Sequence, residues 1–180
     1  MHACLRVLSC WCWLLALGAV LLTGTVSRAQ SENMVKCAFV YNFAKLIEWP
    51  EASFPSGSTK LAVGFVGNTP LADAFTQATT GKNANGHEFE IHKLGGAGEA
   101  VSCHIVVVCD AGQTDAVLAT VKGRPVLTVG DIDGFTAAGG MIGLMKDGAK
   151  VTFELNVAPS AEAGIKLDPK LRKIAKAVKS

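Results

Sequence analysis

Cys103-His-Ile-Val-Val-Val-Cys109 is the stretch that decides the fold, because it is apolar and β-branched along most of its length. Such a run is typical of a strand that is buried on both faces of a sheet. Residues 113–122 then favour a helix, and Pro125 to Val129 favours another short apolar strand. A helix between two buried strands predicts a right-handed parallel crossover, and therefore an α/β protein.

Upstream of this unit the pattern is similar. Lys60 to Val66 is predicted to be a buried strand, and His87 to Leu94 alternates as a further strand would. Between them, a helix is expected over residues 70–79, with Thr69 as its cap and Pro70 in its first turn. The connection from Leu94 to Cys103 is short for a packed helix, so we expect it to be irregular or the next strand to be antiparallel.

Downstream, a β-hairpin is predicted from Met141 to Asn156, with its turn at Asp147-Gly148. Pro159 to Ile165 favours a helix, and Asp168-Pro169 is expected to cap and open the last one. Together these elements predict a three-layer α/β sandwich, in which helices cover both faces of a mixed sheet of five or six strands.

The last helix is expected to have an apolar stripe and a basic face. The stripe consists of Leu171, Ile174, Ala175 and Val178, and the basic residues are Lys170, Arg172, Lys173, Lys176 and Lys179. Two interpretations remain open. The basic face is simply solvated near a helix C-terminus, or it is attracted to an acidic partner or an anionic membrane surface.

Residues 1–29 have the features of a secretory signal peptide, with Arg6 before an apolar run from Val7 to Leu22 and small residues at Ser27 and Ala29. An uncleaved anchor is the alternative, since the run approaches the ~17 residues that can span a bilayer. We therefore expect a leader over residues 1–29 and a single domain over residues 30–180. That domain is expected in the periplasm, without membrane insertion after cleavage.

Composition excludes two broad classes. The 180 residues include 17 Lys and Arg against 15 Asp and Glu, and 49% of them are hydrophobic. A nucleic-acid binder that depends on net charge needs a clear basic excess. General disorder needs low hydrophobicity and high net charge. The chain is therefore expected to fold and to bind no nucleic acid.

The sequence has no recognisable catalytic, metal or cofactor site. Gly64-Phe-Val-Gly67 lacks the glycine spacing and the lysine of nucleotide-binding loops. Gly130-Asp-Ile-Asp-Gly134 lacks the further oxygen ligands of a calcium loop. His87 and His92 fall on opposite faces of their predicted strand, so they cannot share a metal. We therefore expect a protein that is not an enzyme and that has no cofactor.

A small-ligand sensor is an alternative function. In an open α/β sheet, ligands bind outside the C-terminal ends of the strands. The loops expected there would offer Gly67, Asn68, Thr69, Asp131 and Asp133 as candidate ligand contacts.

Three cysteines follow the predicted leader: Cys37, Cys103 and Cys109. On a regular strand the Cα atoms of Cys103 and Cys109 would lie ~20 Å apart, too far for a disulfide bond. Cys37 could pair with only one of them, so at least one thiol stays free within a monomer. Buried free cysteines, a bridge that involves Cys37 and a link between chains all remain possible.

The segment over residues 32–48 is expected to be helical and is apolar on most sides, so it is buried in its own domain or forms an interface. Its sequence from Met34 to Pro50, with Tyr-Asn-Phe-Ala-Lys45 and Glu-Trp-Pro50, resembles the opening of the YfiR family. These are exported bacterial proteins named for a repressor of membrane-bound diguanylate cyclases. The similarity continues in order through Cys103-His104, Val126 to Asp131 and Phe153 to Asn156.

The resemblance implies a non-catalytic periplasmic repressor with an α/β sandwich fold, often dimeric. Such a protein binds the sensor domain of an inner-membrane diguanylate cyclase or another membrane sensor, and so lowers cyclic di-GMP and limits biofilm formation. The motif residues are candidates for the interface: Tyr41, Asn42, Phe43, Lys45, Glu48, Trp49 and Pro50.

One feature departs from the family pattern. In members of the named type, a cysteine in the first strand can pair with the cysteine that heads the Cys-His strand. Residues 60–67 contain no cysteine here, so no such bridge to Cys103 is expected.

Overall fold

The computed structural model describes residues 29–55 and 58–179. The chain divides into two compact units, residues 1–33 and residues 34–180. Of the first unit, residues 29–33 are described and are helical. Apart from residue 29, the predicted leader lies outside the described residues.

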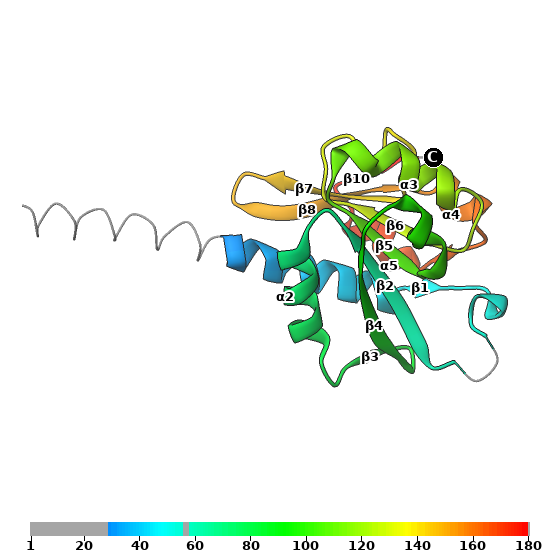
Figure 1. Cartoon of the computed structure of the whole chain (residues 1–180). Coiled ribbons are helices and arrows are strands. Elements are labelled where there is room, and N and C mark those ends of the chain that lie inside the picture. The colour runs from blue at the N-terminus through cyan, green and yellow to red at the C-terminus, as the bar shows by residue number, and fades with distance from the viewer. Residues whose placement is uncertain (1–28, 56–57, 180) are drawn as a thin grey trace, which may run out of the picture. The chain divides into compact units, whose positions relative to one another are not determined.

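The second unit is built on an eight-stranded sheet with the order β10-β8-β7-β6-β5-β2-β4-β3 (Figure 1). Its strands are β2 (Lys60–Val66), β3 (Asn83–Ala84), β4 (His87–Leu94), β5 (Ile105–Val108), β6 (Leu127–Gly130), β7 (Ile142–Asp147), β8 (Lys150–Asn156) and β10 (Ala177–Lys179). Two further strands, β1 (Ile47–Glu48) and β9 (Lys166–Leu167), pair with each other. The mixed α/β class was predicted, but five or six strands was wrong. The two additional strands are the short edge strands β3 and β10.

The central strands β4, β2, β5 and β6 are parallel. The predicted parallel crossover from β5 to β6 is confirmed, and α3 (Thr114–Val121) connects them. The connection from β4 to β5 is a 3-10 helix, η2 (Ala97–Ser102). It was therefore correctly expected to be irregular, whereas an antiparallel β5 does not occur, because β4 and β5 both pair in parallel with β2.

The hairpin of β7 and β8 is also confirmed, but its turn lies one residue further along the chain than predicted. Asp147 pairs with Lys150, so the two loop residues are Gly148 and Ala149. Gly148 has φ +61°, a conformation that favours glycine at the first position of such a loop.

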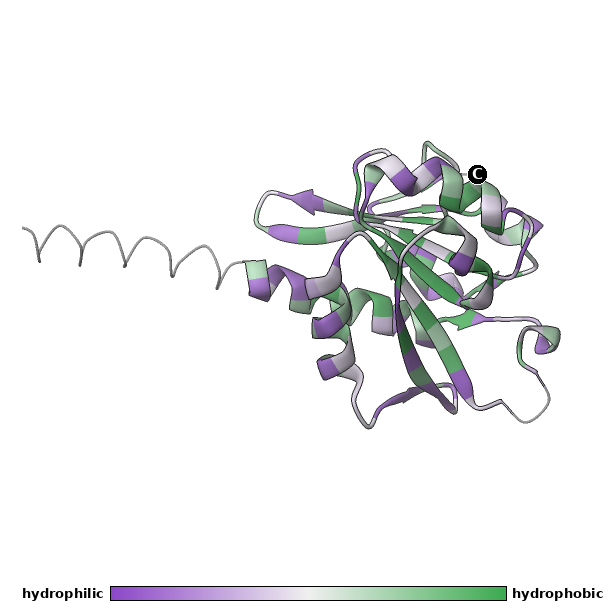
Figure 2. Cartoon of the chain, viewed as in Figure 1, coloured by the Kyte–Doolittle hydropathy of each residue, from purple (hydrophilic) through white to green (hydrophobic). Residues whose placement is uncertain are grey.

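Helices pack on both faces of the sheet, as predicted, and a hydrophobic cluster lies on each face. On β2, Leu61, Val63 and Phe65 belong to the first cluster, whereas Val66 belongs to the second. A helix over residues 34–45, called the N-terminal helix below, packs on the first face together with α2 (Thr69–Thr79) and α5 (Pro169–Ile174). Helices α3 and η2 pack on the second face. Figure 2 shows hydrophobic residues concentrated along the central strands between these layers.

Two helix-capping residues were predicted, and one of them was wrong. Asn68, rather than Thr69, caps α2, because its side-chain oxygen accepts a hydrogen bond from the Leu71 amide at 2.9 Å. Asp168 caps α5 as predicted and accepts from the Lys170 amide at 2.8 Å.

The predicted basic helix is shorter than expected. Helix α5 ends at Ile174, and the chain then forms β10 beside β8. The Lys176 amide donates to the Phe153 carbonyl at 2.9 Å, so pairing with a distant strand overrides the local helical pattern. Val178 therefore lies on a strand, and the apolar stripe is not one helix face.

On the second face, the buried ring of Phe135 packs against Gly130 and Gly140. A Cβ atom at either glycine would overlap the ring atoms. Phe135 is 2% exposed. The close approach of this ring to two stretches of backbone therefore requires glycine at both positions.

Candidate functional site

The motif that carries the family resemblance divides into buried and exposed residues. Phe43 is 1% exposed, and its ring lies edge-on to Phe153 with 5.0 Å between centroids. Ile47 begins β1 and is also buried. These residues anchor the N-terminal helix to the first face, so Phe43 contributes to the core and not to the surface.

Trp49 and Pro50 join the end of this motif to the sheet. The Trp49 indole N–H donates to the His104 carbonyl at 3.3 Å, and its ring lies edge-on to Phe54 and His104. Pro50 begins the 3-10 turn η1 (Glu51–Ser53). Trp49 and Pro50 are half-buried, and they set the path of the loop that leads to Phe54.

Phe54 is stacked between two histidines, His87 and His104, an arrangement that was not predicted from the sequence. Its ring centroid is 4.0 Å from that of His87 and 4.5 Å from that of His104, with interplanar angles of 13° and 14°. The residues come from a loop, from β4 and from the residue before β5. No local sequence signal links them.

His104 is fixed as a neutral imidazole. The Ala62 amide donates to its Nδ1 at 3.0 Å, and its Nε2 donates to the Ser53 carbonyl at 3.0 Å. Burial lowers the pKa of His104, and the nearby His87 acts in the same direction, while the bond to Ser53 opposes them. His104 therefore connects η1 to β2 by hydrogen bonds that need the uncharged ring.

The exposed side of the N-terminal helix forms a distinct surface, which we call the helix face. Its exposed or half-buried residues are Met34, Val35, Ala38, Tyr41, Asn42 and Lys45. Tyr41 donates to the Asn83 carbonyl at 3.4 Å, and the amines of Lys45 and Lys82 each lie 5.6 Å from its ring centroid. Glu48, also from the motif, is exposed on β1. The helix face is thus apolar at its N-terminal end and cationic at its C-terminal end.

The loops at the C-terminal ends of the strands pack against one another. Gly67 has φ +86°, and a Cβ atom on it would lie 2.6 Å from the Asp110 side chain. The Asn68 side chain is engaged as the cap of α2, whereas Thr69 and Asp133 are exposed. Of these candidate ligand residues, Asn68 is thus already engaged within the fold, and Gly67 is in close contact with Asp110.

Asp131, the remaining candidate from these loops, is paired with Lys36 of the N-terminal helix. Their side chains are 10% (Lys36) and 17% (Asp131) exposed, and Lys36 Nζ lies 2.7 Å from Asp131 Oδ2. The charges of both residues act on the neighbouring Cys109 thiol. The structure thus brings together a cation, a carboxylate and a thiol.

All three cysteines that follow the predicted leader are free thiols. Burial raises the pKa of Cys37 to about 11 and that of Cys109 to about 12, to which the Asp131 charge adds. Burial also raises the pKa of Cys103. Cys37 and Cys103 belong to clusters on opposite faces of the sheet, so they are not placed to pair.

Gly64 of β2 lies directly beside Cys103. A Cβ atom at Gly64 would be 2.8 Å from the Cys103 sulfur and 2.5 Å from Cδ1 of Leu94. In this chain the Leu94 side chain fills the space beside Cys103. Gly64 therefore marks the position in the first strand that faces the cysteine heading the Cys-His strand.

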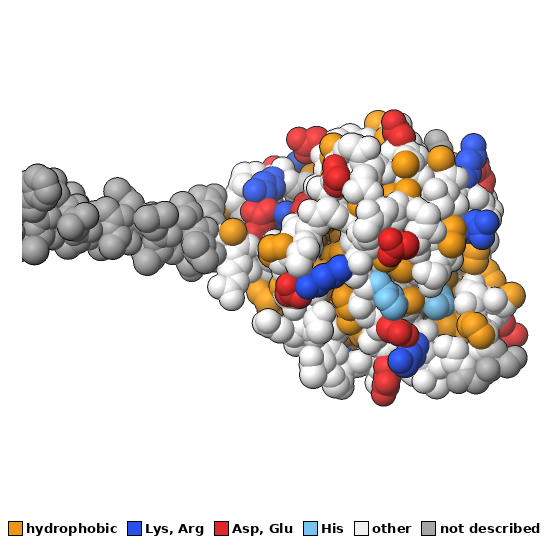
Figure 3. Space-filling view, in the orientation of Figure 1, with side chains coloured by type: hydrophobic (Ala, Val, Ile, Leu, Met, Phe, Trp, Pro, Cys, Tyr) orange, Lys and Arg blue, Asp and Glu red, His pale blue; other side chains and the backbone are white. Residues whose placement is uncertain are grey.

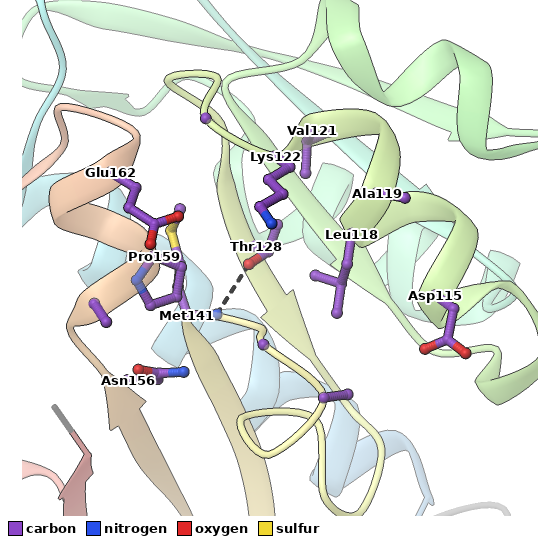
Figure 4. A pocket seen from close by; sticks show the side chains of 14 residues that line it. Asp115, Leu118, Ala119, Val121, Lys122, Thr128, Met141, Asn156, Pro159 and Glu162 are labelled. Carbon is purple, nitrogen blue, oxygen red and sulfur yellow. Dashed lines mark hydrogen bonds between the residues drawn. The ribbon is translucent and has the colours of Figure 1, made fainter.

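A hollow of about 380 Å³ lies on the second face between α3 and α4 (Ala158–Glu162). Lys122 and Glu162 extend into it from its two walls, and Leu118 and Pro159 add apolar surface (Figure 4). Thr128 lies at its base, where its hydroxyl accepts from the Met141 amide at 3.0 Å. This hollow could not be predicted from the sequence, because its walls come from segments that are far apart in the chain.

Within residues 29–55 and 58–179, no three His, Cys, Asp or Glu side chains are grouped so that they could hold a metal ion. In the same part of the chain, no helix combines the length and the apolar character that crossing a membrane requires.

Comparison with known proteins identifies a family and a solved structure with a similar fold. A family model described as YfiR/HmsC-like matches residues 33–176. A crystal structure of a conserved domain protein from Vibrio cholerae O1 biovar El Tor is similar to this chain, with a TM-score of 0.53 and 10% sequence identity. The similarity covers 66% of this chain and 54% of that one. The chain therefore spans about half the length of the Vibrio cholerae protein, and this likeness concerns the fold alone.

Proposed function

Because the chain belongs to the YfiR/HmsC-like family, we propose that it is an exported, non-catalytic regulator that acts in the periplasm. It binds the periplasmic sensor domain of an inner-membrane signalling protein. The expected target is a diguanylate cyclase, which the bound protein holds inactive, so that cyclic di-GMP falls and biofilm formation is limited.

The observation that carries this proposal is the helix face. Met34 is 48% exposed and Val35 is 42% exposed, on the same helix whose other side anchors the core. Large apolar side chains that are exposed next to polar ones are typical of interaction surfaces. No other element among the described residues of the second unit buries these two side chains.

The other end of the helix face indicates what the target surface offers. Tyr41 lies between Lys45 and Lys82, and tyrosine is enriched where protein interfaces gain most of their binding energy. Two cations beside an aromatic ring favour an acidic surface on the partner. The partner is thus expected to present an apolar patch flanked by carboxylates.

The test is a pull-down from solubilised membranes, combined with an assay of cyclase output with and without the purified protein. Val35→Asp places a charge in the apolar end of the helix face, and Lys45→Glu reverses the charge at the other end. Each is expected to weaken partner capture by about tenfold or more and to restore cyclase activity.

Matched controls come from other surfaces. Val178→Asp changes a valine of β10 that is 45% exposed, and Arg124→Glu reverses an exposed cation after α3. Both are expected to retain repression. Unchanged cyclase output in the presence of the wild-type protein would refute the proposed function.

A small-ligand sensor is the second candidate, and the hollow between α3 and α4 favours it. Its two walls present opposite charges, Lys122 and Glu162, above an apolar lining. A thermal-shift screen with small polar molecules tests this function, because a bound ligand raises the melting temperature with its concentration. The gain should disappear in Lys122→Ala. A screen in which no compound stabilises the wild-type protein would rule against this candidate.

A further inference from the structure

The outer side of β4 is an open sheet edge over most of its length. Strand β3 pairs with β4 only at His87 and Glu88. From Phe89 to Leu94, no strand among the described residues pairs with the outer side of β4. Hollows of about 640 Å³ and 290 Å³ follow this edge, and Ile91 and Thr76 line both of them.

The backbone groups at this edge can be assigned to residues. The Glu88 amide donates inward, to the Thr59 carbonyl at 2.7 Å. Because alternate residues of a strand turn their backbone groups to opposite neighbours, Glu90 and His92 also bond to β2. Phe89, Ile91 and Lys93 therefore direct their N–H and C=O groups outward. A row of such groups is a template for another strand.

The sequence of this edge is complementary to itself. If two copies pair in antiparallel fashion about a two-fold axis at Ile91, Glu90 lies opposite the partner's His92, and Phe89 lies opposite the partner's Lys93. Each pair joins an acid to a base or a cation to an aromatic ring, and such cross-strand pairs stabilise a sheet. Ile91 then lies opposite the partner's Ile91, with backbone hydrogen bonds in both directions.

The alternative registers are less favourable. Shifting the partner by two residues in one direction places Glu90 opposite the partner's Glu90. A shift in the other direction places His92 opposite the partner's His92. Two carboxylates directly opposite each other destabilise a strand pair, and in the second shift Glu90 no longer lies opposite the partner's His92. The sequence of β4 therefore favours the register that is centred on Ile91.

The side chains beside the edge are accessible to a second copy. Glu90 and His92 are each 41% exposed on the second face, and Val101 of η2 is exposed nearby. Figure 3 shows acidic, basic and histidine side chains next to one another on the face where Figure 1 places β4. We infer that β4 is the edge through which two copies of this chain form a symmetric dimer with one continuous sheet.

The test exchanges the side chains of Glu90 and His92. In the dimer of Glu90→His, histidines lie opposite each other at positions 90 and 92, and in the dimer of His92→Glu, glutamates do. In each single variant the dimer dissociation constant is therefore expected to rise about tenfold. The double variant Glu90→His/His92→Glu restores opposite partners and should return dimerisation close to the wild-type level. Sedimentation of protein purified after expression of the full chain measures these constants, and circular dichroism verifies that each variant is folded.

Amide hydrogen exchange gives an independent measurement. The amides of Phe89, Ile91 and Lys93 should become protected as protein concentration rises, whereas those of Glu90 and His92, which bond to β2, should be protected at all concentrations. A monomer at every concentration, or a dimer that neither single variant weakens, would overturn the inference. A monomer whose edge variants lose a different protein partner would also overturn it and would assign the edge to a strand of that partner.

Discussion

Lys36 Nζ lies 2.7 Å from Asp131 Oδ2, in a pair whose side chains are 10% and 17% exposed. The contact joins the N-terminal helix to the turn that follows β6. A buried pair of charges is costly to form, but it is more costly to break, because the remaining charge stays desolvated. The attachment of the N-terminal helix therefore depends on both members of the pair.

Asp131→Ala should lower the free energy of unfolding by about 3 kcal/mol, because it removes the carboxylate that lies 2.7 Å from the largely buried Lys36 ammonium group. The double variant Lys36→Met/Asp131→Leu removes both charges and should recover most of that loss. Urea denaturation of the three proteins measures these differences. A loss below about 1 kcal/mol in Asp131→Ala would mean that the pair behaves as a surface ion pair.

The same pair should control the reactivity of Cys109. The negative charge of Asp131 raises the pKa of Cys109, and the positive charge of Lys36 lowers it. Asp131→Asn should therefore lower this pKa from about 12 and speed alkylation at a fixed alkaline pH, since the thiolate is the nucleophile. Lys36→Met should slow the reaction. Mass spectrometry measures both rates, and Cys103 on the opposite face is the internal reference. Shifts in the same direction for both variants would contradict this account.

Stability should fall in mild acid, in part through His104. Its pKa is lowered in the folded state, whereas in the unfolded chain it has the ordinary value of about 6.5. Above that pH both states carry a neutral ring. As the pH falls below about 6.5, the unfolded state takes up a proton before the folded state does, so the free energy of unfolding decreases until the lower folded pKa is reached.

His104→Asn should make the loss of stability between pH 7.5 and 5.5 smaller, although this variant is less stable at pH 7.5. Denaturant titrations at the two pH values measure the difference. An unchanged pH dependence in His104→Asn would show that His104 does not contribute.

Gly64→Cys should form a disulfide bond with Cys103 under oxidising conditions, because the new Cβ atom would lie 2.8 Å from the Cys103 sulfur. Closing a loop of this length is expected to add about 3–4 kcal/mol, less the cost of displacing Leu94. Peptide mapping without reductant identifies the bridge. Gly64→Ala is the matched control, and it should be destabilised by about 1–3 kcal/mol through overpacking. Two free thiols in the oxidised Gly64→Cys protein would refute the prediction.

The elements that could be predicted from the sequence are those whose signal is local. Strand β2 occupies the residues expected, Lys60–Val66, because a continuous apolar run between turn residues needs no distant partner to be recognised. Strand β10 was missed because it forms only against β8. Nothing between Ala177 and Lys179 favours a strand over the continuing helical pattern.

The same distinction explains the sites. The cysteines and the motif around Tyr41 were identified from their residue types and from the family resemblance. The stack of Phe54 on His87 and His104 could not be predicted, because its members are brought together by strand pairing over long separations. The hollow between α3 and α4 was missed for the same reason.

Because Phe135 packs directly against Gly130 and Gly140, the residues at these three positions are expected to change together in evolution. A lineage that gains a side chain at either glycine must shrink the aromatic residue at the same time, since a close-packed interior has no spare volume to absorb it. Descendants of this chain should therefore keep all three residues or exchange them together, and an isolated change at one of them should be rare.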